Sequence, residues 1–145
     1  MSKYTPVFLL FLTTIVGCAK QKAATTSIMT VNIIGDSTWT ANEVTATIIL
    51  GNAYVTGTNT ATGQVMSLIL YGYRDGNKAY AVHDEASMGS VVTGGTAEYH
   101  YPSYVQDAST GSVEIVDSAG RMMTGNFDVQ NTEIHITGRF TVPMP

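Results

Sequence analysis

The chain has 145 residues and a mass of 15.5 kDa, which is enough for one modest domain with its own buried core. Asp, Glu, Lys and Arg make up only 12% of the residues, a low share that gives poor material for surface helices. The formal net charge is −4, and the basic residues are scattered singly. This pattern argues against a nucleic-acid-binding protein and against a polybasic patch for anionic lipid.

The beginning of the chain has the features of an export signal. Lys3 supplies a positive charge, and residues 7–16 (VFLLFLTTIV) form an apolar run. As a helix this run would rise about 15 Å, roughly half the thickness of the hydrocarbon core of a bilayer. It is therefore too short for a permanent membrane span, and we predict a signal peptide over residues 1–17.

The only cysteine follows this run directly. The sequence Ile15-Val16-Gly17-Cys18 resembles the bacterial lipobox, in which the cysteine thiol is acylated and the preceding peptide bond is cut. The resemblance implies that Cys18 becomes the lipid-bearing first residue, and two or three acyl chains make such an attachment stable. Acylation would leave no thiol for a disulfide, a metal or a nucleophile.

Residues 18–27 then form the lipidated cysteine and a flexible tether, since they are short, polar and small, and residues 28–145 form the domain. No acidic residue directly follows Cys18. In lipoprotein sorting this favours the outer membrane, facing the periplasm, with the cell surface as the alternative. The expected partner is therefore the membrane, through the lipid anchor.

Apolar and polar residues alternate with a period of two from about residue 29 to the end of the chain. This is the pattern of half-buried antiparallel strands, and no segment has ten residues of helical periodicity. Residues 65–71 (VMSLILY) are apolar on both faces, which predicts a central strand covered on each side. The pair Asp75-Gly76 favours a tight turn into a return strand over residues 78–82.

Three further hairpins are predicted, and they pair residues 44–48 with 53–58, residues 112–116 with 122–129, and residues 122–129 with 133–142. Gly57, Gly125 and Gly138 each follow an apolar–threonine pair inside a strand, where glycine permits a bulge or a close approach of the backbone as the sheet bends. About nine strands, within a range of 8–10, imply an all-β domain. It is either an antiparallel β-sandwich or a flattened up-and-down barrel.

Among the enriched residue types, tyrosine is the one most suggestive of binding. Tyr99, Tyr101 and Tyr104 lie close together in one predicted strand and its turn, and a tyrosine ring offers a flat apolar face with a polar tip. They could stack on a sugar ring or on an apolar group of a partner, or pack against one another across strands. Trp39 is expected to fill the core near the start of a strand.

A second candidate is the segment His83-Asp84-Glu85, which opens the longest stretch without strand character. Loops on rigid β scaffolds often carry function, so these residues are candidate ligand contacts. A metal or general-base site would need a second cluster that the spacing does not supply, so we expect no metal, no cofactor and no catalytic residue. A solvated turn is the simpler explanation of the segment.

Two turns carry possible modification sites. Asp36-Ser37-Thr38 and Asp117-Ser118-Ala119 resemble the O-glycosylation signal of exported proteins in Bacteroidota, which would make Ser37 and Ser118 the acceptors. An Asx-type turn accounts for both tripeptides without a sugar.

The domain as a whole resembles small Bacteroidota-type lipoproteins of unknown function. The resemblance covers roughly residues 28–143 and rests on four features: Gly35 followed by Trp39, the run TGTN at 56–59, GSVEI at 111–115 leading to TGNF at 124–127, and the closing ITGRF at 136–140. It implies an all-β lipoprotein domain with no established reaction.

These observations predict a non-enzymatic, outer-membrane-anchored binding module for a glycan, a small ligand or a protein. The first alternative is an assembly subunit of an envelope complex, in which sheet edges meet a partner. The second alternative is a hydrolase or metal enzyme centred on residues 83–85.

Overall fold

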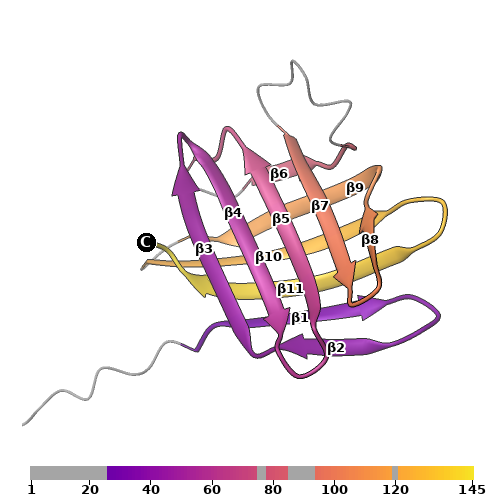
Figure 1. Ribbon diagram of the computed structural model, residues 1–145. Helices are drawn as coiled ribbons and strands as arrows, with labels where there is room; N and C mark the ends of the chain where they lie inside the picture. Colours follow the sequence, from indigo (N-terminus) through magenta and orange to yellow (C-terminus); the bar gives the residue numbers. More distant parts are fainter. Residues whose placement is uncertain (1–25, 75–77, 85–93, 119–120) are drawn as a thin grey trace, which may run out of the picture.

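The computed structural model describes residues 26–74, 78–84, 94–118 and 121–145, and these residues form two antiparallel sheets packed face to face. Figure 1 shows the strands of one sheet crossing those of the other steeply. The two sheets remain separate, so the fold is a β-sandwich and not a closed barrel. This decides between the two architectures that the sequence left open. Cys18 and most of the predicted tether lie outside the described residues.

One sheet has six strands in the order β2-β1-β11-β10-β9-β6. Its strands are, in chain order, β1 (Ile28–Ile33), β2 (Thr38–Ala41), β6 (Lys78–Ala81), β9 (Thr110–Asp117), β10 (Met122–Gln130) and β11 (His135–Pro143). The other sheet has five strands in the order β3-β4-β5-β7-β8. They are β3 (Glu43–Ile49), β4 (Asn52–Asn59), β5 (Gln64–Tyr71), β7 (Gly94–Tyr101) and β8 (Tyr104–Asp107).

The described residues thus contain eleven strands, compared with the predicted nine or so. The two additional strands, β2 and β8, have four residues each, too few for an alternating pattern to stand out in the sequence. The predicted hairpins β3–β4, β9–β10 and β10–β11 are all present. The predicted hairpin between residues 65–71 and 78–82 is wrong, because β6 pairs with β9 in the opposite sheet.

Strand β5 is the central strand of the five-stranded sheet, as its apolar sequence predicted. Its even-numbered residues are buried against the six-stranded sheet, while the odd-numbered ones are only half-buried on the outer face. The expectation that it is covered on both sides is therefore wrong. No second layer of described residues lies over the outer face, and neighbouring side chains provide the partial cover.

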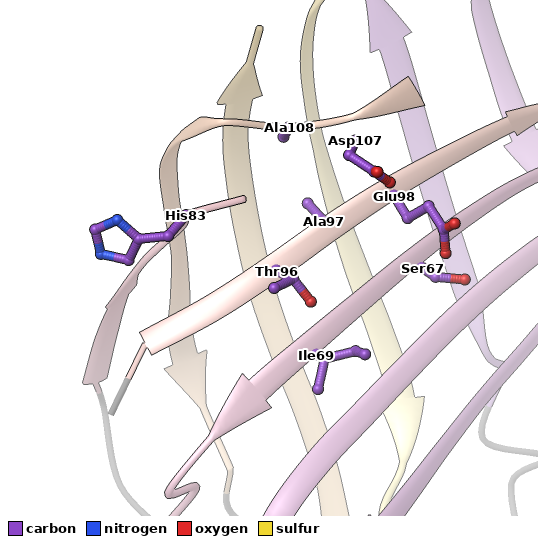
Figure 2. Close-up of a pocket in the computed structure, with 8 residues that line it drawn as sticks. All are labelled: Ser67, Ile69, His83, Thr96, Ala97, Glu98, Asp107 and Ala108. Atoms are coloured by element: carbon purple, nitrogen blue, oxygen red, sulfur yellow. The ribbon is translucent and has the colours of Figure 1, made fainter. Parts of the chain in front are cut away.

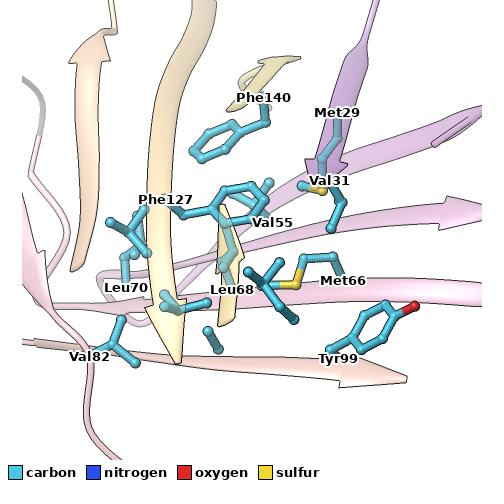
Figure 3. Packing of buried hydrophobic residues seen from close by; sticks show 14 of the residues in the cluster. Met29, Val31, Val55, Met66, Leu68, Leu70, Val82, Tyr99, Phe127 and Phe140 are labelled. Atoms are coloured by element: carbon cyan, nitrogen blue, oxygen red, sulfur yellow. The ribbon is translucent and has the colours of Figure 1, made fainter. Parts of the chain in front are cut away.

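The core lies between the two sheets and is built from the inward-facing residues of both (Figure 3). Each large side chain buried there contributes about 1.5–3 kcal/mol relative to an exposed position. Trp39 belongs to this core, as predicted, and its Nε1 has no hydrogen-bond partner within the described ranges. The fully buried side chains with the largest volumes are Tyr80, Tyr99, Phe140, Met29, Met66, Leu68 and Leu70.

Two of the three strand glycines, Gly125 and Gly138, lie where neighbouring strands approach closely, which is one of the predicted roles. Gly125 lies opposite Phe140, and Gly138 lies opposite Phe127, in the β10–β11 register. An added Cβ would come within 2.5 Å of the Phe140 ring at Gly125 and within 2.2 Å of the Phe127 ring at Gly138. Each glycine therefore provides the space for a phenylalanine ring on the neighbouring strand. The predicted bulge does occur at Gly125, where the pairing of β10 with β9 shifts register.

Candidate functional site

The three tyrosines selected from the sequence lie on the β7–β8 hairpin and form a row of four rings with Trp39. Tyr101 lies opposite Tyr104, and their rings stack with centroids 5.4 Å apart and an interplanar angle of 12°. The Tyr101 ring meets Tyr99 edge-on at 6.2 Å, and Tyr99 lies 6.3 Å from Trp39. The row therefore runs from the core to the surface, and its outer pair is anchored by its inner pair.

The exposure of these rings separates their roles. Tyr99 is 1% exposed, whereas Tyr101 and Tyr104 are 40% and 47% exposed. Only the outer pair can therefore contact a ligand. Tyr99 supports the pair from below, and its hydroxyl accepts a hydrogen bond from Gln64 Nε2 (3.0 Å). Burial raises the pKa of Tyr99, and this hydrogen bond partly offsets the effect.

A cleft of about 450 Å³ opens beside Tyr104, at the end of the sandwich where three chain segments meet. Tyr104 and Gln106 come from the edge strand β8, and the other walls come from the β1–β2 turn and the β10–β11 turn. Its volume falls within the range of small-molecule pockets. The residues lining it are Ile33, Ile34, Gly35, Asp36, Tyr104, Gln106, Glu133 and Ile134.

Local backbone chemistry builds the first of these walls. Gly35 has φ +85°, a left-handed conformation that glycine adopts without strain, and it lets β1 reverse into β2. The turn is closed by hydrogen bonds from Ile33 N to Ser37 O (2.7 Å) and from Asp36 N to Ile33 O (3.0 Å). A third bond, from Ile34 N to His135 O (2.9 Å), ties the turn to β11. The Asp36 carboxylate is thereby presented at the rim of the cleft.

Asn131 organises the opposite wall. Its Oδ1 accepts hydrogen bonds from the backbone N–H groups of Glu133 (2.8 Å) and Ile134 (2.9 Å), which shapes the β10–β11 turn. Its Nδ2 donates to Gln106 Oε1 and to the carbonyl of Asp107, both at 2.9 Å. Gln106 Nε2 in turn donates to Glu133 Oε2 (2.9 Å). The edge strand β8 is thus fastened to the turn, and the Glu133 carboxylate is held in place.

The second predicted cluster lies in a different pocket. His83 lines a small cavity of about 70 Å³ on the outer face of the five-stranded sheet, together with Glu98 and Asp107 (Figure 2). The figure shows its imidazole pointing away from both carboxylates. Asp84 follows it in the chain, and Glu85 lies outside the described residues. Neither His83 nor Asp84 lines the cleft beside Tyr104.

The two candidate glycosylation sites differ in setting. Ser37 is exposed at the β1–β2 turn, where its Oγ donates to the Asp36 carboxylate at 3.3 Å. Ser118 is half-buried directly after β9. Among the described residues, no group of three His, Cys, Asp or Glu side chains could hold a metal ion. Within the same ranges, no helix is long and apolar enough to cross a membrane.

Most of the cleft could not be selected from the sequence. Asp36 entered only as part of a glycosylation tripeptide, and Gln106, Glu133 and Ile134 carried no distinguishing pattern. They belong to segments far apart in the chain, two turns and the edge strand β8, and only the sheet order brings these segments to one end of the sandwich. The sequence feature that did point to the cleft was the pair Tyr101 and Tyr104, which flank Pro102-Ser103. The β7–β8 hairpin places these two tyrosines side by side.

No protein family, curated protein or solved structure matches this chain. The resemblance to small Bacteroidota-type lipoproteins therefore stays a prediction from the sequence. The class that the fold defines is a two-sheet antiparallel β-sandwich with a cleft at one end.

Proposed function

We propose that this chain is an outer-membrane lipoprotein, anchored through acyl chains on Cys18, whose β-sandwich is a non-enzymatic binding module. The ligand, a glycan, a small molecule or part of a protein, is captured in the cleft beside Tyr104. The observation that carries the proposal is the exposed Tyr104, which stacks on Tyr101 and lines a cleft of about 450 Å³. Exposed aromatic rings at a concave surface are typical of ligand recognition.

The rigidity of the site also supports binding. Tyr104 is stacked on Tyr101, and Gln106 is held by Asn131, so neither wall must be ordered when a ligand arrives. A preformed site avoids the entropic cost of immobilising side chains, which is about 0.5–1.5 kcal/mol for each one.

The binding test uses the full chain in detergent solution against a glycan array and a tripeptide array. Replacement of Tyr104 by alanine is expected to lower the affinity for the captured ligand at least about tenfold. Tyr54→Ala is the matched control, because Tyr54 is a half-buried tyrosine on the outer face of the same sheet. Failure of both arrays, or an equal loss in the Tyr54 variant, would contradict the proposal.

The anchor is tested separately. Growth with radiolabelled palmitate is expected to label the wild-type chain and not Cys18→Ala, and the variant should leave the membrane fraction. Labelling retained in Cys18→Ala would show that the anchor proposal is wrong while leaving the binding proposal intact.

The second candidate function, assembly into an envelope complex, is favoured by a different surface. The tip of the β3–β4 hairpin exposes three consecutive aliphatic side chains, of Ile48, Ile49 and Leu50, and Leu50 is 98% exposed. Contiguous exposed apolar side chains often mark a contact with a partner. Ile49→Ser combined with Leu50→Asn should remove a stable envelope complex detected by crosslinking in cells. A crosslinking pattern unchanged from wild type would contradict this candidate.

A further inference from the structure

The polar groups that the cleft offers to a ligand are mainly hydrogen-bond acceptors. Asp36 and Glu133 contribute carboxylates, and both residues are exposed. The amide of Gln106 is already committed, since its nitrogen donates to Glu133 and its oxygen accepts from Asn131. What remains available is negative charge, the Tyr104 hydroxyl and the flat face of the Tyr104 ring.

The basic residues of the described ranges lie elsewhere. Arg121 directly precedes β10, at the end of that strand remote from the cleft, and Lys78 places its Nζ 5.2 Å from the centroid of the Tyr80 ring. Arg139 lies on the outer face of the six-stranded sheet, opposite Thr30 and Asn126. None of these, nor Arg74, lines the cleft. The charges of the cleft are therefore not neutralised by a lining lysine or arginine.

Negative charge also surrounds this end of the molecule. Asp107 follows Gln106 on β8, and Asp128 lies near the same end of β10, where its Oδ1 is 2.8 Å from His135 Nε2. The charge of Asp36 contributes to raising the pKa of Tyr99, after the larger effects of burial and of its neighbours Tyr104 and Tyr101. The field in the cleft disfavours anions and attracts cations.

We propose that the cleft binds a positively charged side chain of a partner protein, and that an arginine guanidinium fits it best. A guanidinium is planar, so it can stack on the exposed face of Tyr104. Its N–H groups can donate in pairs to a carboxylate, which suits Glu133 and Asp36 on the flanking turns. The aliphatic stem of the arginine can lie against Ile34 and Ile134. This inference rests on the proposed function and names its ligand class.

The test compares two peptides that differ only in charge. The pentapeptide Gly-Arg-Gly-Arg-Gly is titrated into the full chain in detergent solution, followed by the same peptide with citrulline in place of arginine. Citrulline has nearly the shape of arginine but is neutral. The arginine peptide is expected to bind about tenfold more tightly, and its affinity should fall as NaCl rises from about 50 to about 500 mM.

Three variants locate the interaction. Glu133→Gln and Asp36→Asn each keep the side-chain shape, and each should weaken arginine-peptide binding several-fold while leaving citrulline-peptide binding unchanged. Asp128→Asn is the matched control, because it removes an exposed carboxylate from the same end of the sandwich without touching the cleft lining. It should change the affinity less than twofold.

The outcomes separate this inference from the proposed function. Equal binding of the two peptides, or an equal loss in Asp128→Asn, would overturn the cationic ligand. Binding of a neutral glycan that depends on Tyr104, with no arginine-peptide binding, would also overturn it but would leave the proposed binding module standing. If neither peptide nor any array ligand binds, both proposals fail.

Discussion

The two edge strands of the five-stranded sheet differ in whether another part of the chain covers them. The β8 edge is short, and Asn131 of the β10–β11 turn donates a hydrogen bond to its Asp107 carbonyl. The β3 edge has seven residues, five of them exposed, and its only neighbour in the sheet is β4. One edge is thus covered and becomes the wall of a cleft, while the other leaves its outer side open.

This difference shows how a β-sandwich can present two kinds of surface at once. An uncovered strand offers free N–H and C=O groups to any extended chain, and proteins usually protect such edges with charge, proline or a covering loop. At β8 the cover is the β10–β11 turn, and its side chains form a concave polar site. At β3 only Glu43 is charged, so this edge suits pairing with another chain.

The largest expected effect comes from uncovering the β8 edge. Asn131→Ala removes four hydrogen bonds, two within the turn and two to β8. We expect a loss of about 2 kcal/mol in the free energy of unfolding, because water replaces part of each bond. Urea denaturation measures it, with Asn126→Ala on the outer face of the six-stranded sheet as the control. A cost below about 0.5 kcal/mol would mean that Asn131 does not hold this edge.

The second prediction concerns the tip beyond the β3 edge. Leu50 has φ +52° and precedes Gly51 at φ +79°, so both central residues of the turn are left-handed. Leucine is strained there, whereas asparagine is favoured. Leu50→Asn is therefore expected to stabilise the domain by up to about 1 kcal/mol, seen as a higher Tm. A lower Tm would show that Leu50 makes a stabilising contact in the isolated protein.

The third prediction concerns alkaline stability near the covered edge. Burial raises the folded-state pKa of Tyr99, with a smaller opposing effect from Gln64, while the unfolded tyrosine ionises near 10.0. As pH rises past about 10, the unfolded state loses this proton first, so stability should fall until the folded pKa is passed. Below about pH 10 the contribution of Tyr99 to the free energy of unfolding is fully present.

Tyr99→Phe isolates this effect. The alkaline fall should be smaller in the variant and should keep the part due to Tyr80, whose pKa burial also raises. Chemical denaturation at a series of pH values from about 8 to about 12 measures both slopes. Identical slopes for wild type and variant would show that Tyr99 does not contribute.

The smallest expected effect is on the stability of the β3 edge itself. Thr45 and Thr47 are exposed, so replacing both by lysine should change the free energy of unfolding by less than about 0.5 kcal/mol. The same change should suppress any concentration-dependent association through this edge, as seen by sedimentation velocity. Lysines at Thr38 and Thr40, on the β2 edge of the other sheet, are the control. If that control suppresses association equally, the β3 edge is not the contact.

The sequence allowed the β-rich fold to be predicted because alternation is a local property of each strand. The pattern in residues 122–129 and 133–142 identified β10, β11 and the hairpin between them, and the apolar run 65–71 identified the central strand. It failed for β2 and β8, which are too short to show a period. It also misplaced β6, since a favourable turn sequence cannot exclude pairing with a strand in the other sheet.

The same limit applies to the site. Tyr101 and Tyr104 could be selected because they flank a turn in one hairpin, so their proximity follows from local geometry. Asp36, Gln106 and Glu133 could not be, because each belongs to a separate segment and their proximity depends on how the two sheets cross.

By itself, the sequence determined that this chain builds an antiparallel β domain and placed three of its hairpins, since side-chain period and turn chemistry act over a few residues. Only the tertiary structure decided that the sheets stay open as a sandwich, and that one edge is covered while the other is exposed. It also decided that two carboxylates from distant turns line the same cleft as Tyr104. These features depend on how segments as far apart in the chain as residues 36 and 133 are arranged in space, which no local pattern encodes.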